Sequence, residues 1–374
     1  LSDTDTTNAV GTELVTNGTF ASNTTGWTAV NSSTLSYSSG KLRITNGASL
    51  NGAANTTITT VVGKTYVVSG EYTAGTSATG QLRVGTTTMG AQLAAGPFAA
   101  GIQTRTFVAT GTTTHINFIN SSVNGQYGEI DNISVRLAEL DRSYNNNGLQ
   151  VFGTVTKTAV ATGAELVGYK PSSSNSSHYL CVNQTDWSIG TGDFSISFWW
   201  NGTSAGDTAQ IYLGIPSTGG SNPASGFNIW TYGGSQKMYI SGSYYDYTDS
   251  GLNKWSLKTI VRRGGVLYLY ENGVLQAGEG GASAGSINDQ KFNVFYGHYG
   301  QTNPAGSMAL LRISATAPTA EQIAKMYNDE KHLFQENAKA TLYGSSDAVT
   351  ALAYDDDTEL LHVGTSAGRS EFQG

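Results

Sequence analysis

A predicted hairpin at residues 255–276 constrains the fold of this chain more than any other segment. Apolar and polar residues alternate over Trp255–Val261, and a turn follows at Arg263–Gly265. A second strand is predicted at Val266–Tyr270, and an Asn272-Gly273 turn comes just after it. Asn and Gly both tolerate the positive φ angles of a tight turn, so the pattern predicts paired antiparallel strands.

The composition extends this prediction to the whole chain. Its 374 residues are enough for two or three domains, each with its own core. Only 13% of the residues are charged and 47 are Gly, while Thr, Ser, Val and Tyr are common, which is typical of an all-β protein with many turns. The single cysteine, Cys181, cannot form an internal disulfide, and we expect it to be a small hydrophobic residue in a strand.

Several functional classes are disfavoured. The net charge of -7 argues against nucleic acid as the partner, because phosphate binding needs clustered Lys and Arg. No apolar run approaches the roughly 20 residues that span a bilayer, so we expect no membrane insertion. The chain starts at Leu1 without a visible signal peptide, and we expect a trimmed or mature part of a longer protein. The scattered histidines form no zinc or catalytic pattern, so we expect no enzyme.

Short predicted strands separated by Gly, Asn and Ser fill the first third of the chain, after a polar segment at 1–11 that we interpret as a linker. Three motifs, at 13–27, 63–66 and 128–135, resemble a family 4/9-type carbohydrate-binding module over residues 12–138. This resemblance implies an antiparallel β-sandwich.

A second set of motifs follows in a fixed order. The segments 141–148, 192–200 and 310–323, together with the hairpin described above, resemble the concanavalin A-like, laminin-G-like family over residues 139–337. A helix is predicted from Thr319 to His332, because Thr319 and Gln322 have the spacing of a capping box.

Residues 338–374 do not continue the sandwich pattern. They predict a hairpin with strands at 349–354 and 359–363, and they resemble one blade of a β-propeller. One blade cannot bury its own faces, so it must pack on the second domain or on partner chains. We therefore predict an all-β chain with two tandem antiparallel β-sandwiches (jelly rolls), one short C-terminal helix and a terminal β-hairpin. We expect a homo-oligomer, a trimer, held in part by this extension.

A structural calcium ion is implied by the first resemblance. In that module, an acidic residue of the first strand and the aspartate of the last strand bind the ion, and here these positions are Glu13 and Asp131. The alternative is that Asp131 caps a turn and Glu13 is solvated.

Aromatic clusters are the candidate glycan-binding residues, because sugars stack their C–H faces on aromatic rings. Tyr244–Tyr247 lie in a polar segment that we predict to be a loop, and loops often provide binding residues. The alternatives are surface tyrosines or rings buried at a subunit interface. Trp27, Trp199, Trp200 and Trp255 are expected in the cores. The candidates are Trp230, Tyr232, Tyr244, Tyr245, Asp246, Tyr247, Tyr296 and Tyr299.

The combination of modules resembles structural proteins of phage virions, especially tail fibres and head decorations. It implies a non-enzymatic, virion-surface adhesion or receptor-binding protein that recognises cell-surface glycans. One alternative is a decoration or assembly protein that binds only other virion subunits. The other is the accessory carbohydrate-binding region of a secreted bacterial polysaccharide-degrading enzyme.

Overall fold

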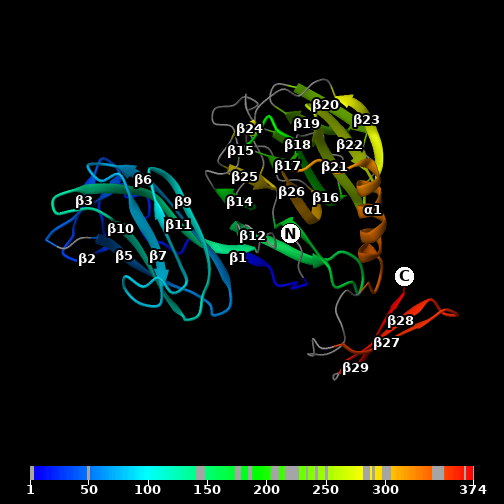
Figure 1. Ribbon diagram of the computed structural model, residues 1–374, viewed down its shortest axis with the longest axis horizontal. Helices are drawn as coiled ribbons and strands as arrows, with labels where there is room; N and C mark the ends of the chain where they lie inside the picture. Colours follow the sequence, from blue (N-terminus) through cyan, green and yellow to red (C-terminus); the bar gives the residue numbers. More distant parts are fainter. Residues whose placement is uncertain are drawn as a thin grey trace.

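In the part of the chain that the structure describes, the regular secondary structure is almost entirely antiparallel strand. In the computed structural model (Figure 1), two β-sandwiches lie side by side and a small separate sheet follows them. The predicted all-β class is confirmed. The structure describes residues 4–48, 51–139, 148–172, 178–183, 188–203, 210–214, 227–232, 235–240, 243–248, 252–280, 287–288, 291–296, 305–338, 349–365 and 368–373.

The first sandwich consists of two five-stranded layers. The core between them contains Phe20, Trp27, Tyr72, Phe98 and Phe118, all buried. One layer has the order β2 (Thr28–Val30), β5 (Gly52–Thr59), β10 (Thr113–Asn120), β7 (Gly80–Gly85) and β8 (Ala94–Phe98). The other has the order β3 (Thr34–Ser38), β4 (Lys41–Thr45), β11 (Tyr127–Glu139), β6 (Thr65–Ala74) and β9 (Gly101–Val108).

The second sandwich also has two layers, and β12 takes part in both. One layer has the order β1 (Ala9–Gly11), β12 (Leu149–Ala159), β13 (Val167–Pro171), β26 (Gly306–Ser314), β16 (Phe194–Gly202), β21 (Ser256–Arg263), β22 (Val266–Glu271) and β23 (Val274–Gly280). The other runs from β12 through β14 (Tyr179–Asn183), β25 (Lys291–Val294), β17 (Gln210–Gly214), β18 (Phe227–Tyr232) and β19 (Ser235–Ile240) to β20 (Ser243–Thr248). β15 (Ser188–Gly190) pairs with β24 (Ile287–Asn288).

The predicted hairpin and its turns are confirmed. β21 pairs with β22 up to Arg263 and Val266, and the turn between them uses Gly264 and Gly265 at positive φ. Asn272 and Gly273, with φ of 51° and 80°, connect β22 to β23. Local sequence alone therefore specifies this three-stranded unit, because the turn residues adopt angles that other residues rarely adopt.

The predicted helix is confirmed as α1 (Ala320–Glu330), followed by the 3-10 turn η1 (Lys331–Phe334). Its capping box is present: Thr319 Oγ1 accepts from the Gln322 amide, and Gln322 Oε1 accepts from the Thr319 amide at 2.8 Å. Trp199 stacks on Tyr327 and Phe334 and donates to Glu330 at 2.7 Å, which attaches the helix to the sheet. The tryptophans predicted to lie in the cores do so: Trp27, Trp199 and Trp200 are buried, and Trp255 packs under the helix end.

The N-terminal segment is not merely a linker, as the sequence had predicted for residues 1–11. Ala9–Gly11 forms β1, which pairs with β12, and Ala9 is buried in the core of the second sandwich. The chain thus starts on the second sandwich, builds the first and returns along β11, whose end pairs with β12 at Ala138 and Gln150. The first sandwich is therefore inserted between β1 and β12.

The C-terminal sheet contains the predicted hairpin and one more strand. β27 (Val349–Asp355) pairs with β28 (Leu360–Thr365), and β29 (Gly368–Gln373) extends the sheet. Figure 1 shows this sheet, in red, standing apart from both sandwiches.

Candidate functional site

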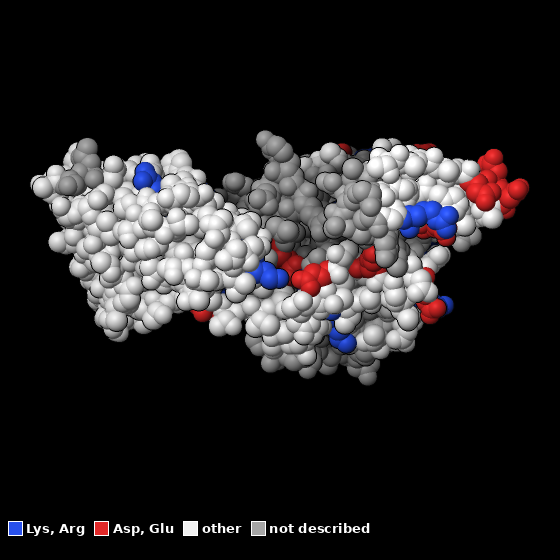
Figure 2. All heavy atoms as spheres, turned by 90° about the horizontal axis from the view of Figure 1, so that it is seen from below, with Lys and Arg blue, Asp and Glu red and all other residues white. Residues whose placement is uncertain are grey.

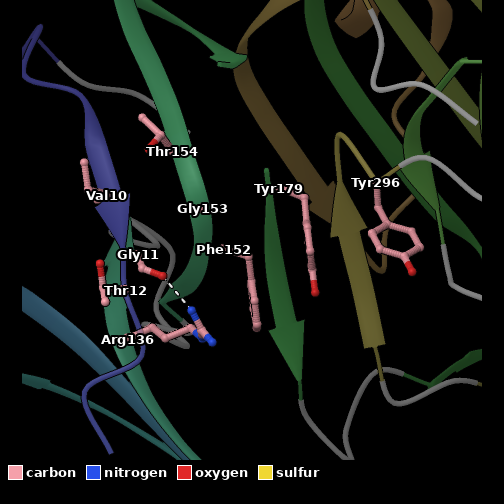
Figure 3. A pocket seen from close by; sticks show the side chains of 9 residues that line it. All are labelled: Val10, Gly11, Thr12, Arg136, Phe152, Gly153, Thr154, Tyr179 and Tyr296. Carbon is pink, nitrogen blue, oxygen red and sulfur yellow. Dashed lines mark hydrogen bonds between the residues drawn. The ribbon is translucent and has the colours of Figure 1, made fainter. Parts of the chain in front are cut away.

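A pocket of about 620 Å³ lies where the two sandwiches meet (Figure 3). β1 and the end of β11 form one side of it, and β12, β14 and the second residue after β25 form the other. It is lined by Val10, Gly11, Thr12, Arg136, Phe152, Gly153, Thr154, Tyr179 and Tyr296.

The wall made by β1 depends on a glycine. Gly11 lies opposite Gly153 in the β1–β12 ladder. A Cβ atom at Gly11 would lie 1.7 Å from the carbonyl oxygen of Val151, closer than atoms can approach. Only a residue without a side chain lets β1 lie this close to β12, and this closeness sets the shape of the pocket.

A row of aromatic rings crosses the other wall. Phe152 and Tyr179 are direct partners in the β12–β14 ladder, so their side chains lie on the same face. Their rings stack with centroids 4.5 Å apart and planes 2° from parallel. Tyr296 meets Tyr179 at 4.9 Å and 72°, an edge-to-face contact. In Figure 3, Phe152 and Tyr179 are seen edge-on, whereas Tyr296 turns its ring face to the viewer.

Arg136 continues this row on the far side of Phe152. Its guanidinium carbon lies 4.4 Å from the centre of the Phe152 ring, a cation–π contact. One terminal nitrogen donates to the Gly11 carbonyl at 2.6 Å, and the other lies 3.2 Å from Glu13 Oε2. Arg136 therefore connects the first sandwich to the aromatic row of the second.

The hydroxyl of Tyr179 stays protonated at neutral pH. Burial is the main cause that raises the pKa of Tyr179 well above its usual value, and Cys181 and Tyr296 raise it further. In Figure 3 the hydroxyls of Tyr179 and Tyr296 point in the same direction. The pocket thus combines aromatic rings with hydroxyl groups that donate and accept hydrogen bonds, including those of Thr12 and Thr154.

The residues predicted to bind glycan belong to several parts of the second sandwich. Tyr244–Tyr247 belong to strand β20, which pairs with β19, so the loop prediction is wrong. Trp230 and Tyr232 lie in β18. The side chains of these strand residues, including Asp246, and all of Tyr299 lie outside the described residues. Among the residues whose side chains the structure describes, Tyr296 is the predicted residue that lines the pocket.

The predicted calcium ligands do not form a suitable donor set. Both carboxylate oxygens of Glu13 accept protein hydrogen bonds, from Val135 N–H at 2.8 Å and Ser134 Oγ at 2.6 Å, and the Arg136 cation lies beside them. A bulge in β11 separates Asp131 from Ser134, and Asp131 lies opposite Glu71 in the ladder between β11 and β6. Among the described residues no group of three or more His, Cys, Asp or Glu could hold a metal ion. Calcium therefore stays a prediction without a fitting ligand set.

Sequence reasoning missed Phe152, Tyr179 and Arg136. No local motif marks them, because they come together through the β12–β14 register and the contact between the sandwiches. Cys181, two residues after Tyr179, is buried in β14, as predicted.

A comparison with protein families supports the fold of the second sandwich. The family model described as the concanavalin A-like lectin/glucanases superfamily matches residues 174–324. This chain contains a concanavalin A-like, laminin G-like domain. No curated protein is similar enough to match the chain. In the part of the chain that the structure describes, no helix is long and apolar enough to cross a membrane.

Solved structures that are similar to part of this chain include three binding domains. The receptor-binding domain of a botulinum neurotoxin C/D mosaic serotype is 16% identical, with a TM-score of 0.41, over 63% of this chain and 59% of that one. The binding domain of botulinum neurotoxin serotype G is 13% identical, with a TM-score of 0.42, over 64% and 62%. The binding domain of Paraclostridial Mosquitocidal Protein 1 is 16% identical, with a TM-score of 0.41, over 60% of each chain. The chain thus spans about three fifths of these structures.

Proposed function

We propose that this chain is a non-enzymatic adhesion protein that binds surface glycans in the pocket between its two sandwiches. The observation that carries this proposal is the aromatic row that ends in Tyr296, set among hydroxyl groups and beside Arg136. The volume of about 620 Å³ is in the usual range for sites that take small ligands.

The rings of the row have different roles. Arg136 covers one face of the Phe152 ring and Tyr179 covers the other, so both faces of Phe152 are occupied by protein side chains. Tyr296 points its edge at Tyr179, which leaves its own faces uncovered by the other rings of the row. Tyr296 is therefore the ring on which the apolar face of a sugar stacks, and the hydroxyls of Tyr179, Thr12 and Thr154 bind the hydroxyls of the sugar.

The chemistry of the lining supports binding rather than hydrolysis. Glycoside hydrolysis uses a pair of carboxyl groups on either side of the scissile bond. The described residues that line the pocket include no Asp or Glu. Glu13 lies close by, but its oxygens are engaged by Arg136, Ser134 and Val135.

The setting that we propose is the surface of a virion, with cell-surface glycans or other virion subunits as partners, and a homo-oligomer as the working state. It rests on the resemblance of the module combination to phage tail fibres and decorations. A secreted bacterial protein is the alternative setting.

A second candidate function is structural assembly without glycan binding. The C-terminal sheet favours it, because Leu352 and Tyr354 are 66% and 59% exposed there. Such a surface is typical of sites that meet another protein.

A glycan array with the full chain tests the main proposal. We expect binding to a defined class of glycans, and Tyr296→Ala should weaken it by roughly 1–3 kcal/mol, the usual loss for a contact residue of this kind. The matched control is Tyr37→Ala, because Tyr37 is 47% exposed on β3 of the first sandwich and lies outside the pocket. Equal melting temperatures of the two variants show that folding is intact. Absence of glycan binding by the wild type, or equal binding by both variants, contradicts the proposal.

A further inference from the structure

Strand β12 changes its partner strand at residues 152–154, which we call the β12 kink. Up to Phe152 it pairs with β14, and from Val155 onward it pairs with β13. Gly153 lies between these two regions with φ of 61°, in the left-handed region that favours glycine. All three residues of the kink line the pocket, so the conformation of the kink sets the shape of that wall.

A histidine ring completes the hydrogen bonds of this kink. The Ser172 amide donates to the Thr154 carbonyl at 3.1 Å, as in a ladder that continues between β12 and β13. The Thr154 amide, however, donates to Nδ1 of His178 at 2.7 Å. Ser172 directly follows β13 and His178 directly precedes β14. The contact therefore lies where β12 passes from one partner strand to the other.

This hydrogen bond fixes the protonation state of the His178 ring. A backbone N–H only donates, so Nδ1 is the unprotonated nitrogen and the ring is neutral, with its proton on Nε2. The Ser172 hydroxyl lies 3.0 Å from the same Nδ1. Once Nδ1 takes up a proton, it becomes a donor. It can then donate to Ser172 Oγ, but it can no longer accept from the Thr154 amide.

Charged side chains are few in this chain, as the largely uncharged face in Figure 2 illustrates, so the titratable groups around the ring can be named. Lys170 of β13 lies two residues before Ser172, so both side chains lie on one face of that segment. β14 contributes Tyr179 and Cys181, and Arg136 of β11 reaches the kink from the first sandwich. The residues that pair between β1 and the kink are uncharged. Lys170 and Arg136 are cations, so neither offers an anion that a protonated ring could bind.

His115 shows why a contact with a backbone amide matters. Its Nδ1 lies 3.3 Å from Thr88 Oγ1 and 3.4 Å from Asn55 Nδ2, which both belong to side chains. A hydroxyl can rotate and a side-chain amide can turn its oxygen toward the ring, so these partners can adapt to a protonated imidazole. The Thr154 N–H belongs to a paired strand and cannot reverse its role. Proton uptake by His178 therefore acts directly on the backbone.

We propose that His178 is a pH-sensitive switch that holds the β12 kink, and with it one wall of the pocket, only while its ring is neutral. Protonation of Nδ1 breaks the contact with Thr154, turns the ring toward Ser172 Oγ and loosens the kink. Histidine is the side chain whose charge ordinarily changes between about pH 5 and 8, so mild acidification is enough to operate the switch. Weaker glycan binding in acid follows as well, and that consequence alone rests on the proposed function.

Hydrogen–deuterium exchange of single backbone amides, followed by NMR on the full chain without any ligand, tests this inference. The Val160 amide, which donates to the Leu166 carbonyl at 2.9 Å, is the internal reference, because the intrinsic exchange rates of both amides change alike with pH. Between about pH 7.5 and 5.5, the protection of Thr154 relative to Val160 should fall at least about tenfold in the wild type, because the Thr154 amide loses its acceptor.

Two histidine variants show whether His178 causes this fall. His178→Asn places a carbonyl oxygen near the position of Nδ1 and takes up no proton, so its relative protection of Thr154 should be the same at both pH values. His115→Asn is the matched control, since it removes a histidine of the first sandwich, and it should respond like the wild type.

The wild-type measurement decides the matter even if His178→Asn does not fold. Relative protection of Thr154 that is unchanged by pH in the wild type would overturn the proposal. So would a fall that persists in His178→Asn, or one that His115→Asn abolishes. Because no ligand is present, a chain that binds no glycan can still show this effect, so the proposed function and this inference fail independently.

Discussion

At the scale of single residues, two carboxylates on β11 show how neighbours decide the cost of a charge. Glu129 lies 2.7 Å from Arg43 and also accepts from Ser38. Burial by itself raises the pKa of Glu129, but these hydrogen bonds and the charge of Arg43 outweigh it and hold that pKa below its usual value. Asp131, two residues on, faces Glu71 instead, and its Oδ1 is buried without a partner among the described residues.

Asp131→Asn should stabilise the protein at neutral pH. Burial, and to a smaller extent Glu71, raise the pKa of Asp131 above 3.8. The folded state therefore binds this proton more tightly than the unfolded state. At a pH above the raised pKa, the ionised carboxylate lowers the free energy of unfolding, and this loss disappears as the pH falls from the raised pKa to below 3.8. We expect a gain of about 0.2–1 kcal/mol at pH near 7, the usual size of a cross-strand charge effect.

Urea unfolding at neutral and acidic pH measures this effect, and Glu129→Gln is the control of opposite sign. Its folded pKa is lowered, so its stabilisation is present at neutral pH and is lost on acidification. Glu129→Gln should therefore destabilise the protein at neutral pH. Destabilisation by Asp131→Asn at neutral pH would show that its carboxylate has a favourable partner, such as a bound cation.

At the scale of elements, the three-residue strand β1 contributes both to the core of the second sandwich and to the pocket. It places Ala9 in the core of the second sandwich and its Gly11 carbonyl against Arg136. Because β1 is an edge strand that lies next to β12, it forms one wall of the pocket and also starts the crossing into the first sandwich. Its position depends on the absence of a side chain at Gly11.

Gly11→Ala should displace β1 and deform the pocket. The new methyl group would collide with the backbone of Val151 rather than with a flexible side chain, so we expect a loss of about 1–3 kcal/mol, as for other overpacked sites. Thermal unfolding measures the loss, and the glycan array should show weaker binding. Gly111→Ala is the matched control, because the nearest atom to its Cβ would be 3.8 Å away. Equal stability of both variants would mean that β1 does not contact β12 as described.

At the scale of the whole molecule, the first sandwich is inserted between β1 and β12 of the second, so the chain passes between the two sandwiches twice. Gln150 on β12 is 2% exposed and donates to the Val67 carbonyl of β6 at 3.2 Å. The Gly148 amide donates to Thr106 Oγ1 of β9 at 3.1 Å. At the base of the junction, Glu139 is buried between Lys157 at 3.4 Å and the Tyr169 hydroxyl at 3.1 Å. The contact between the sandwiches therefore contains satisfied, buried polar groups.

The two sandwiches should unfold together. If one sandwich unfolded alone, the buried polar groups of Gln150, Glu139 and Lys157 would lose their hydrogen-bond partners or become exposed. This loss raises the free energy of the partly unfolded state. Calorimetry should show one transition, and Gln150→Ala should lower its temperature or split it, with a cost of about 1–3 kcal/mol. Gln103→Ala is the control, because Gln103 bonds to Ala99 within the first sandwich. Two separate transitions in the wild type would contradict this prediction.

The sequence by itself determined the features that depend on near neighbours in the chain. The Asn272-Gly273 turn, the strand alternation before it and the Thr319–Gln322 capping box all formed as predicted, because their energies come from residues a few positions apart. The laminin G-like domain was recognisable for the same reason, since its motifs are short and ordered along the chain.

Tertiary structure alone decided the features that depend on pairing between distant strands. It made β1 part of the second sandwich, set Asp131 against Glu71 instead of Glu13, and made Tyr244–Tyr247 a strand rather than a loop. It also assembled Arg136, Phe152 and Tyr179 beside Tyr296. The physical reason is that strand register is set by the burial of whole faces, so a side chain's neighbours across a sheet cannot be inferred from its neighbours in sequence.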